Sequence, residues 1–355
     1  ILLVDLASRQ GVIDSSWRDQ LWPMVRRAAA FLARNGPVSP QDRWEEEPGY
    51  YPFTIANEIA ALLVAADRAD AASPCHGFVP IKNRPPDQAV GPAALMVSLD
   101  ALAFVRFGLR AADDPRIVNT VKVVDATLKV DTPRGPVWHR YQGDGYGEHA
   151  DGGPFDGTGV GRAWPLLTGE RAHYELAAGR RDVAKELAHA MEALAGESCL
   201  LPEQIWDSAD IPDRGLFIGH ASGSAMPLVW AHAEYIKLCR SLLDGEIFDR
   251  PPQTVQRYLE EKVTSGHIIW RFNNKVHAMP PGRILRVETR AQAVVHWSVD
   301  GWRTVHDTPT RDTTLGVHVA DLQTLDLSIG DRVDLTFNWP EADRWEGVDF
   351  VVWVE

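Results

Sequence analysis

The period of the hydrophobic pattern changes near residue 266, and this change limits the possible fold more than any other feature of the sequence. Before that point, apolar residues recur at helical spacing. After it, they alternate in short runs rich in valine and isoleucine, separated by turn pairs such as Asp300-Gly301 and Gly330-Asp331. We therefore expect a mainly helical domain over residues 1–250, followed by a small all-β sandwich domain over residues 266–355.

Seven segments of the first part carry the apolar stripe of an amphipathic helix. They span residues 19–33, 54–69, 93–109, 117–128, 164–178, 182–195 and 225–243. Long loops that contain glycine and proline separate these segments, at residues 36–53, 72–92, 131–163 and 198–223. Connections of that length are uncommon in compact domains and are usually functional, so we expect the chemistry of this chain in its loops.

Charge and composition exclude several classes of protein. The net charge is −13, from 49 acidic and 36 basic residues, which argues against binding of nucleic acid or of an anionic membrane surface. No apolar run reaches the about 18–20 residues of a spanning helix. Three cysteines are too few for a disulfide scaffold, and no HExxH or HxxxH spacing predicts a metal site. The acidic loops leave room for a structural Ca²⁺, although no EF-hand pattern is present.

Two of the long loops place a carboxylate close to a tryptophan. The first contains Trp44-Glu45-Glu46-Glu47, and the last contains Glu203, three residues before Trp206. Desolvation against an aromatic wall lets a carboxylic acid donate a proton near neutral pH. Taken singly, the first loop could be a solvated acidic turn and Glu203 a helix-start residue. Taken together, they describe the two carboxylates of a glycosidase.

Two further loop segments carry distinctive residues. Arg140 and Asp144 form a pair that could hydrogen-bond sugar hydroxyls, or a purely structural ion pair. Gly159 and Gly161 are spaced as in some phosphate loops, but no Lys-Ser/Thr follows and no strand precedes them, which excludes a nucleotide site. The 13 tryptophans fit both core packing and stacking on sugar rings.

Five segments of the chain, in this order, resemble motifs of glycoside hydrolase family fifteen, which contains glucoamylases and glucodextranases. They are residues 36–56, 138–145, 161–166, 202–204 and 223–235. The resemblance implies an (α/α)₆ barrel with its site formed by loops at one end. Such a barrel has twelve helices, so this chain is expected to lack the first ones. An N-terminal segment or a separate chain is expected to complete it.

The resemblance also implies roles for single residues. Glu45 is expected to be the general acid, and Glu203 the general base that activates water. The residues expected to bind sugar are Trp44, Glu46, Arg140, Tyr141, Asp144, Trp164 and Trp230. No redox cofactor or catalytic metal is implied. The implied activity is inverting, exo-acting hydrolysis that releases β-glucose from α-glucans or α-gluco-oligosaccharides.

Two alternatives remain open at this point: a non-catalytic glucan-binding or assembly subunit, and an inverting glucoside phosphorylase. The phosphorylase would need a basic pocket near Glu203, whereas residues 205–210 are apolar and acidic. The loop at 72–92 is expected to help choose between α-1,4 and α-1,6 linkages. In the β domain, Trp297, Trp302 and Trp345 are candidates for glucan contact, although packing between domains is the expected role for at least one. The cellular compartment stays open.

Overall fold

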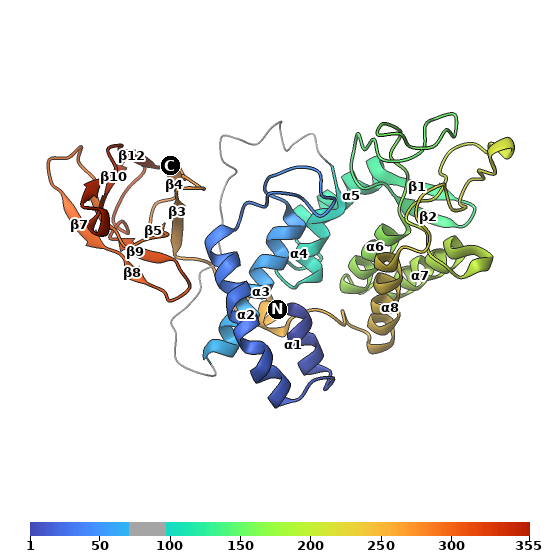
Figure 1. The fold of residues 1–355 in the computed structure, drawn as a ribbon, viewed down its shortest axis with the longest axis horizontal. Helices are drawn as coiled ribbons and strands as arrows, with labels where there is room; N and C mark the ends of the chain where they lie inside the picture. The colour runs from blue at the N-terminus through green and yellow to red at the C-terminus, as the bar shows by residue number, and fades with distance from the viewer. Residues whose placement is uncertain (71–96) are drawn as a thin grey trace. The chain divides into compact units, whose positions relative to one another are not determined.

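The computed structural model describes residues 1–70 and 97–355 (Figure 1). The described residues form two compact units, one from residues 1–70 and 262–355 and the other from residues 97–261. The predicted domains, residues 1–250 and 266–355, have other boundaries than these two compact units and stay a prediction. The loop at 72–92 and the start of the segment 93–109 lie outside the described residues.

The first unit begins with three helices, α1 (Leu2–Arg9), α2 (Ser15–Asn35) and α3 (Pro52–Asp70). Asp14 is the N-cap residue that precedes α2, and its carboxylate accepts hydrogen bonds from two backbone N–H groups of the first turn. The buried faces of α2 and α3 meet at Val25, Ala29 and Ala65. The helices predicted at 19–33 and 54–69 are confirmed, whereas α1 was not predicted.

The β-rich part of the first unit consists of two sheets around one core. The larger sheet has the order β4 (Ala278–Met279), β12 (Phe350–Val354), β10 (Arg332–Trp339), β6 (Val294–Ser298), β7 (His306–Pro309), with β11 (Arg344–Trp345) also paired to β10. The other sheet has the order β3 (His267–Arg271), β5 (Ile284–Thr289), β9 (His318–Leu322), β8 (Arg311–Asp312). Alternate residues of each strand, such as Leu285 and Val287 of β5, face this core. Two pairs are parallel, β3 with β5 and β12 with β4, so the sheets are mixed.

Within the first unit, the end of α2 packs against the smaller sheet. Ala33 shares a buried cluster with Val317 and Val319. Arg271 of β3 donates a hydrogen bond of 2.7 Å to the carbonyl oxygen of Gly36, just beyond α2. A Cβ atom at Gly36 would lie 2.7 Å from Oε2 of Glu58, so only glycine fits at this junction without a shift.

The second unit is mainly helical. It contains a 3₁₀ turn, η2 (Leu99–Leu102), the helices α4 (Ala103–Arg106), α5 (Pro115–Leu128), α6 (Pro165–Ala177), α7 (Arg181–Ala195), α8 (Val229–Asp244) and α9 (Pro252–Thr254), and the hairpin β1 (Lys129–Thr132) with β2 (Gly135–Trp138). Helix α6 is buried over most of its length because it packs against α7, α8 and β2. The hairpin occupies the start of a segment that was predicted to be a loop.

The predicted helix at 93–109 is wrong over its described part, where only η2 and α4 form. The chain leaves the helical path at Gly108, which has φ +71°. Arg106, the last residue of α4, is buried and forms ion pairs with Glu234 at 2.5 Å and with Asp249 at 2.9 Å. The apolar stripe that suggested a long helix therefore surrounds a buried charge network. The helices predicted at 117–128, 164–178, 182–195 and 225–243 are confirmed, the last beginning only at Val229.

Candidate active site

Arg140 is the centre of a polar and aromatic cluster in the loops of the second unit. Its Nε and Nη2 atoms donate to the two carboxylate oxygens of Asp144 at 2.8 and 2.7 Å, and both side chains are buried. The guanidinium carbon lies 5.1, 5.5 and 5.2 Å from the ring centres of Tyr146, Trp164 and Tyr141, respectively. A bidentate pair of this kind fixes the orientation of the arginine fork.

A close approach of two loops holds Asp144 in place. The backbone N–H of Gly161 donates to the carbonyl oxygen of Asp144 at 2.8 Å. A Cβ atom at Gly161 would lie 2.5 Å from the Cβ of Asp144, so a larger residue would push the loops apart. Next along the chain, the backbone N–H of Trp164 donates to the carbonyl of Trp138 at 2.8 Å.

Glu203 lies in an extended segment that is fixed on both sides. Its own backbone N–H donates to Ala225 at 2.8 Å, and the side chain of Gln204 donates to the carbonyl oxygen of Tyr146 at 2.7 Å. The hydroxyl of Tyr146 donates to Oε2 of Glu203 at 3.2 Å. Burial and the nearby Glu203 carboxylate raise the pKa of Tyr146, so the phenol remains a donor. The structure thus brings Arg140, Asp144 and Glu203 into one network.

Sequence reasoning missed Tyr146, the residue that joins the Arg140 cluster to Glu203. Its position two residues after Asp144, in a loop already marked by the Arg140 motif, was the available signal. Trp230, by contrast, was predicted from its motif. It lies in the first turn of α8 and is 36% exposed.

The aromatic neighbour of Glu203 in this network is Tyr146 rather than Trp206. Trp206 is fully buried, and the guanidinium of Arg162 lies 4.0 Å from its ring centre. Arg162 also donates to Asp207 at 2.9 Å, and Asp207 accepts from the backbone N–H of Ala163 at 3.0 Å. Arg162 and Asp207 therefore support the loop beneath Glu203, a role that the sequence did not reveal.

In the first unit, the loop at residues 39–49 carries the predicted general acid. Ser39 and Gly49 close the loop by two backbone hydrogen bonds of 2.9 Å. The carboxylate of Asp42 accepts from the backbone N–H groups of Trp44 and Glu46, both at 3.0 Å. These bonds enclose Glu45, which has φ +64°.

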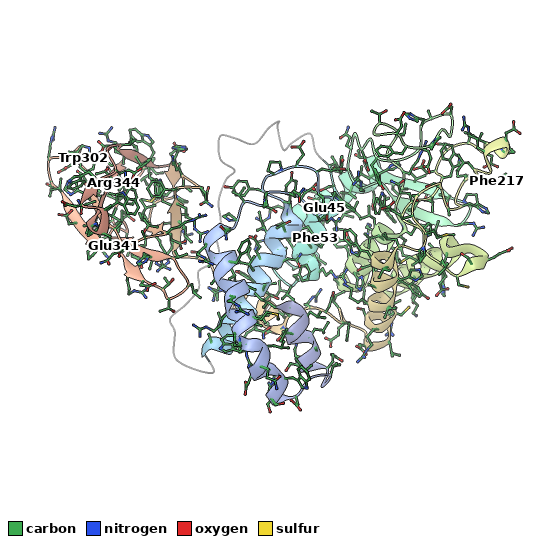
Figure 2. All side chains as sticks on the ribbon, viewed as in Figure 1. Glu45, Phe53, Phe217, Trp302, Glu341 and Arg344 are labelled. Carbon is green, nitrogen blue, oxygen red and sulfur yellow. The ribbon has the colours of Figure 1, made fainter. Side chains whose placement is uncertain are left out.

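A left-handed conformation is uncommon for a residue with a side chain, and such strain is found most often at functional sites. Glu45 is therefore held in an unfavourable backbone conformation by the loop around it. The guanidinium of Arg43 lies 4.5 and 4.4 Å from the ring centres of Trp44 and Phe53, respectively, which links this loop to the start of α3. Figure 2 labels Glu45 of the loop and Phe53 of α3. Glu45 belongs to the first unit and Glu203 to the second, so their pairing in one site is a proposal.

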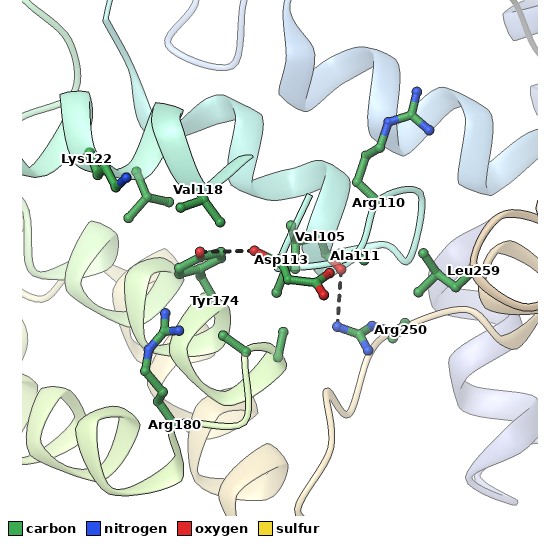
Figure 3. A pocket seen from close by; sticks show the side chains of 14 residues that line it. Val105, Arg110, Ala111, Asp113, Val118, Lys122, Tyr174, Arg180, Arg250 and Leu259 are labelled. Atoms are coloured by element: carbon green, nitrogen blue, oxygen red, sulfur yellow. Dashed lines mark hydrogen bonds between the residues drawn. The ribbon is translucent and has the colours of Figure 1, made fainter. Parts of the chain in front are cut away.

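A cavity of about 530 Å³ lies elsewhere in the second unit, beside α5 and α6 (Figure 3). Its lining includes four basic side chains, those of Arg110, Lys122, Arg180 and Arg250. Arg250 donates to the carbonyl oxygens of Arg106 and Val105, and burial lowers its pKa. None of the predicted site residues lines this cavity.

In the part of the chain that the structure describes, no group of three or more His, Cys, Asp or Glu side chains is arranged to hold a metal ion. No helix among residues 1–70 and 97–355 combines the length and the hydropathy needed to cross a bilayer.

Known proteins resemble this chain over parts of its length. The family model described as glycosyl hydrolases family 15 matches residues 2–84. A glucoamylase of Clostridium sp. (strain G0005) is 36% identical over 278 residues, which cover 66% of this chain and 38% of that protein. A cycloisomaltooligosaccharide glucanotransferase of Niallia circulans is 36% identical over 93 residues, which cover 23% of this chain and 10% of that protein.

A solved structure gives a similar result. The crystal structure of a bacterial glucoamylase complexed with acarbose matches with a TM-score of 0.58 and 36% identity, over 68% of this chain and 41% of that one. The chain thus spans about two fifths of the length of the glucoamylases that it matches. The mainly helical fold, with its loop-borne carboxylates and its β region, is that of a glycosidase family. The chain belongs to glycosyl hydrolases family 15, as its five sequence motifs predicted.

Proposed function

We propose that this chain carries the catalytic carboxylates of an inverting, exo-acting α-glucoside hydrolase of the glucoamylase or glucodextranase type. The observation that carries the proposal is the network that joins Arg140 and Asp144 to Glu203 through Tyr146. It consists of a fixed cation, three aromatic rings and an oriented carboxylate in adjacent loops. This set can hold a sugar ring by its hydroxyls and its apolar face while a base acts on a water molecule.

In the proposed reaction, Glu45 donates a proton to the glycosidic oxygen as the bond from that oxygen to the anomeric carbon breaks. Glu203 takes a proton from a water molecule, whose oxygen bonds to the anomeric carbon from the opposite face. Inversion requires a gap of about 6.5–9.5 Å between the two carboxyl groups to admit this water. Tyr146 orients Glu203 through its hydrogen bond.

The remaining predicted residues bind the sugar in this proposal. They are Trp44, Glu46, Arg140, Tyr141, Asp144, Trp164 and Trp230. The substrate is an α-glucan or an α-gluco-oligosaccharide, in line with the names of the relatives. We propose that no redox cofactor or catalytic metal takes part, with Ca²⁺ at most structural. The closed (α/α)₆ barrel and a further polypeptide segment that completes it are part of the same proposal.

The test is incubation with maltose, isomaltose, trehalose and longer α-glucans, with the anomer of the first glucose followed by NMR. β-Glucose is the expected first product, because an acid and a base on opposite faces leave no covalent intermediate. α-Glucose before mutarotation would contradict the mechanism. A parallel incubation with inorganic phosphate distinguishes a phosphorylase, which would release glucose 1-phosphate instead.

A further inference from the structure

Glu148 is a buried glutamate beside the proposed active site, and neither the sequence motifs nor the proposed reaction assigns it a role. It lies two residues after Tyr146 and is 6% exposed. Glutamate side chains are almost never fully buried unless other groups compensate their charge, so a buried one needs an explanation. The contacts of its two carboxylate oxygens supply one.

The two carboxylate oxygens of Glu148 have unequal surroundings. Oε1 accepts a hydrogen bond from the backbone N–H of Gly223. Oε2 is also buried, and no donor among residues 1–70 and 97–355 lies within hydrogen-bonding distance of it. A buried acceptor that lacks a donor destabilises the folded state. Stability alone therefore explains Glu148 poorly, and the bond to Gly223 is the contact that needs a purpose.

Gly223 belongs to a segment that pairs with the segment of the proposed base. The Oγ atom of Ser224 accepts from the backbone N–H of Gln204 at 3.0 Å. The carbonyl oxygen of Ala225 accepts from the backbone N–H of Glu203 at 2.8 Å. A shift of Gly223 and the residues that follow it would therefore move the backbone that carries Glu203.

The contact between Glu148 and Gly223 is close, and its Glu148 side is anchored. A Cβ atom at Gly223 would lie 2.8 Å from Oε1 of Glu148, so a larger residue would displace the carboxylate. The carbonyl oxygen of Glu148 accepts from Nη2 of Arg162 at 2.8 Å, and Arg162 is itself buried. The backbone of Glu148 is thus fixed to the same arginine that supports the loop beneath Glu203.

Glu148 also acts on the phenol of Tyr146. Burial is the main cause of the raised pKa of Tyr146, the charge of Glu203 adds to it, and the charge of Glu148 makes a smaller contribution in the same direction. A protonated phenol can donate to Oε2 of Glu203, as it does here at 3.2 Å. Glu148 therefore affects Glu203 both through its backbone and through its side-chain partner.

We propose that Glu148 is a positioning residue for Glu203. Its Oε1 atom holds the Gly223 segment, and this segment in turn holds the backbone of Glu203. The inference rests on the proposed function, in which Glu203 takes a proton from water. A displacement of about 1 Å can slow a reaction by about 100-fold, because the reacting groups must meet in a narrow range of geometry. A hydrogen bond outside the reacting groups can therefore control the rate.

The experiment compares two substitutions of Glu148 that differ in one contact. Glu148→Gln keeps an oxygen that can accept from Gly223, whereas Glu148→Leu is of similar size and has no acceptor. We expect kcat on maltose to fall by about 10–100-fold in Glu148→Leu, with a smaller change in KM, and Glu148→Gln to restore most of the loss. Gly223→Ala should resemble Glu148→Leu, because its Cβ displaces the same carboxylate.

The matched controls are Glu197→Leu and Glu197→Gln, because Glu197 is exposed and precedes Glu203 by six residues. Both should leave kcat unchanged. Urea unfolding separates a loss of positioning from a loss of stability. Its midpoint in Glu148→Leu should stay close to that of the wild type, because leucine removes the unpaired Oε2 together with the bond to Gly223.

Hydrogen exchange measured by mass spectrometry gives a readout that does not need catalysis. The amides of residues 203–204 and 222–225 should exchange faster in Glu148→Leu than in the wild type, and Glu148→Gln should exchange like the wild type. Equal kcat in the wild type, Glu148→Leu and Gly223→Ala would overturn the inference, as would an equal loss in both Glu148 variants. If the wild type releases no glucose, the proposed function fails, and the exchange rates alone decide whether Glu148 holds the Glu203 segment.

Discussion

The phenol oxygen of Tyr146 lies 3.2 Å from Oε2 of Glu203 and donates a hydrogen bond to it. The backbone carbonyl of Tyr146 accepts a second bond from Gln204, so this tyrosine is tied to the Glu203 segment through both its side chain and its backbone. The same ring lies beside Arg140. Tyr146 therefore connects the residue proposed to activate water with those proposed to hold the sugar.

Tyr146→Phe tests this connection. The substitution keeps the ring beside Arg140 and removes the hydrogen bond to Glu203, which then has more freedom to rotate. Hydrogen bonds to charged groups contribute about 1.5–3 kcal/mol, so we expect kcat on maltose to fall by about tenfold or more, with a smaller change in KM. Tyr235→Phe, which removes a hydrogen bond to Glu192, is the control. An unchanged kcat in Tyr146→Phe would exclude a positioning role.

Glu45→Gln and Glu203→Gln are each expected to reduce turnover by about 10²–10⁴-fold while the fold remains intact, because each removes a proton-transfer group. Glu47→Gln, in the same acidic run as Glu45, should have a mild effect. Initial rates of glucose release and circular dichroism are the measurements. Normal turnover in either of the first two variants would disprove that assignment, and a wild type that binds glucan but releases no glucose would favour a binding subunit.

Arg106→Met is expected to destabilise the second unit strongly. Arg106 is buried against Glu234 and Asp249, and its loss leaves two carboxylates without their main partner. Removal of one member of a buried ion pair costs about 3–5 kcal/mol. Arg116→Met provides the comparison, because Arg116 pairs with Asp114 but is 70% exposed, and such pairs contribute about 0–1 kcal/mol. Urea unfolding of both variants measures the difference, and equal midpoints would contradict this account.

The raised pKa of Glu58 predicts that the stability of the protein depends on pH. Burial raises its pKa from 4.5 to about 7, and the attraction of Arg271 is a smaller, opposing effect. The folded state therefore holds the proton more tightly than the unfolded state. The resulting contribution to the free energy of unfolding is complete below pH 4.5 and is lost as the pH rises through 7.

The glutamine of Glu58→Gln cannot ionise. At pH 8 the free energy of unfolding of this variant should therefore exceed that of the wild type by on the order of 1–2 kcal/mol, which urea unfolding measures. Near pH 4.5 the two proteins should be nearly equal in stability. Glu47→Gln, an exposed change, serves as the comparison at both pH values. A variant that is less stable than the wild type at pH 8 would show that the Glu58 carboxylate is held by Arg271 as a favourable charge pair.

The sequence predicted the long, regular elements well and the charge-dependent parts poorly. Helix α7 has a repeating apolar stripe that the fold buries, and β5 alternates as half-buried strands do. The segment at 93–109 has a similar apolar content, but a buried Arg106 and Gly108 interrupt it. Whether an arginine is buried depends on partners such as Glu234 and Asp249, more than 120 residues away in the sequence. Local periodicity carries no information on such partners.

The candidate site was also predicted only in part. Motifs marked Arg140, Asp144 and Glu203, which the structure places in one network. Tyr146 and Arg162 contact residues of other loops, namely Glu203 and Asp207. The sequence alone does not show which loops lie close together. Trp206 was read as an aromatic wall because it follows Glu203 closely, whereas the fold buries it under Arg162. Proximity in sequence was a poor guide there because an extended segment points its residues in different directions.

The hydrogen bond from Arg271 to Gly36 joins two parts of the chain that are synthesised at different times. These two residues are 235 positions apart, and Tyr50, on the far side of the Glu45 loop, bonds to Asn274. At about 5–20 residues per second, synthesis needs tens of seconds to travel from one partner to the other. Both anchors of the Glu45 loop are therefore absent until translation reaches the β domain. A nascent chain would therefore have its second unit translated in full before Arg271 and Asn274 can bond to the segments on either side of the Glu45 loop.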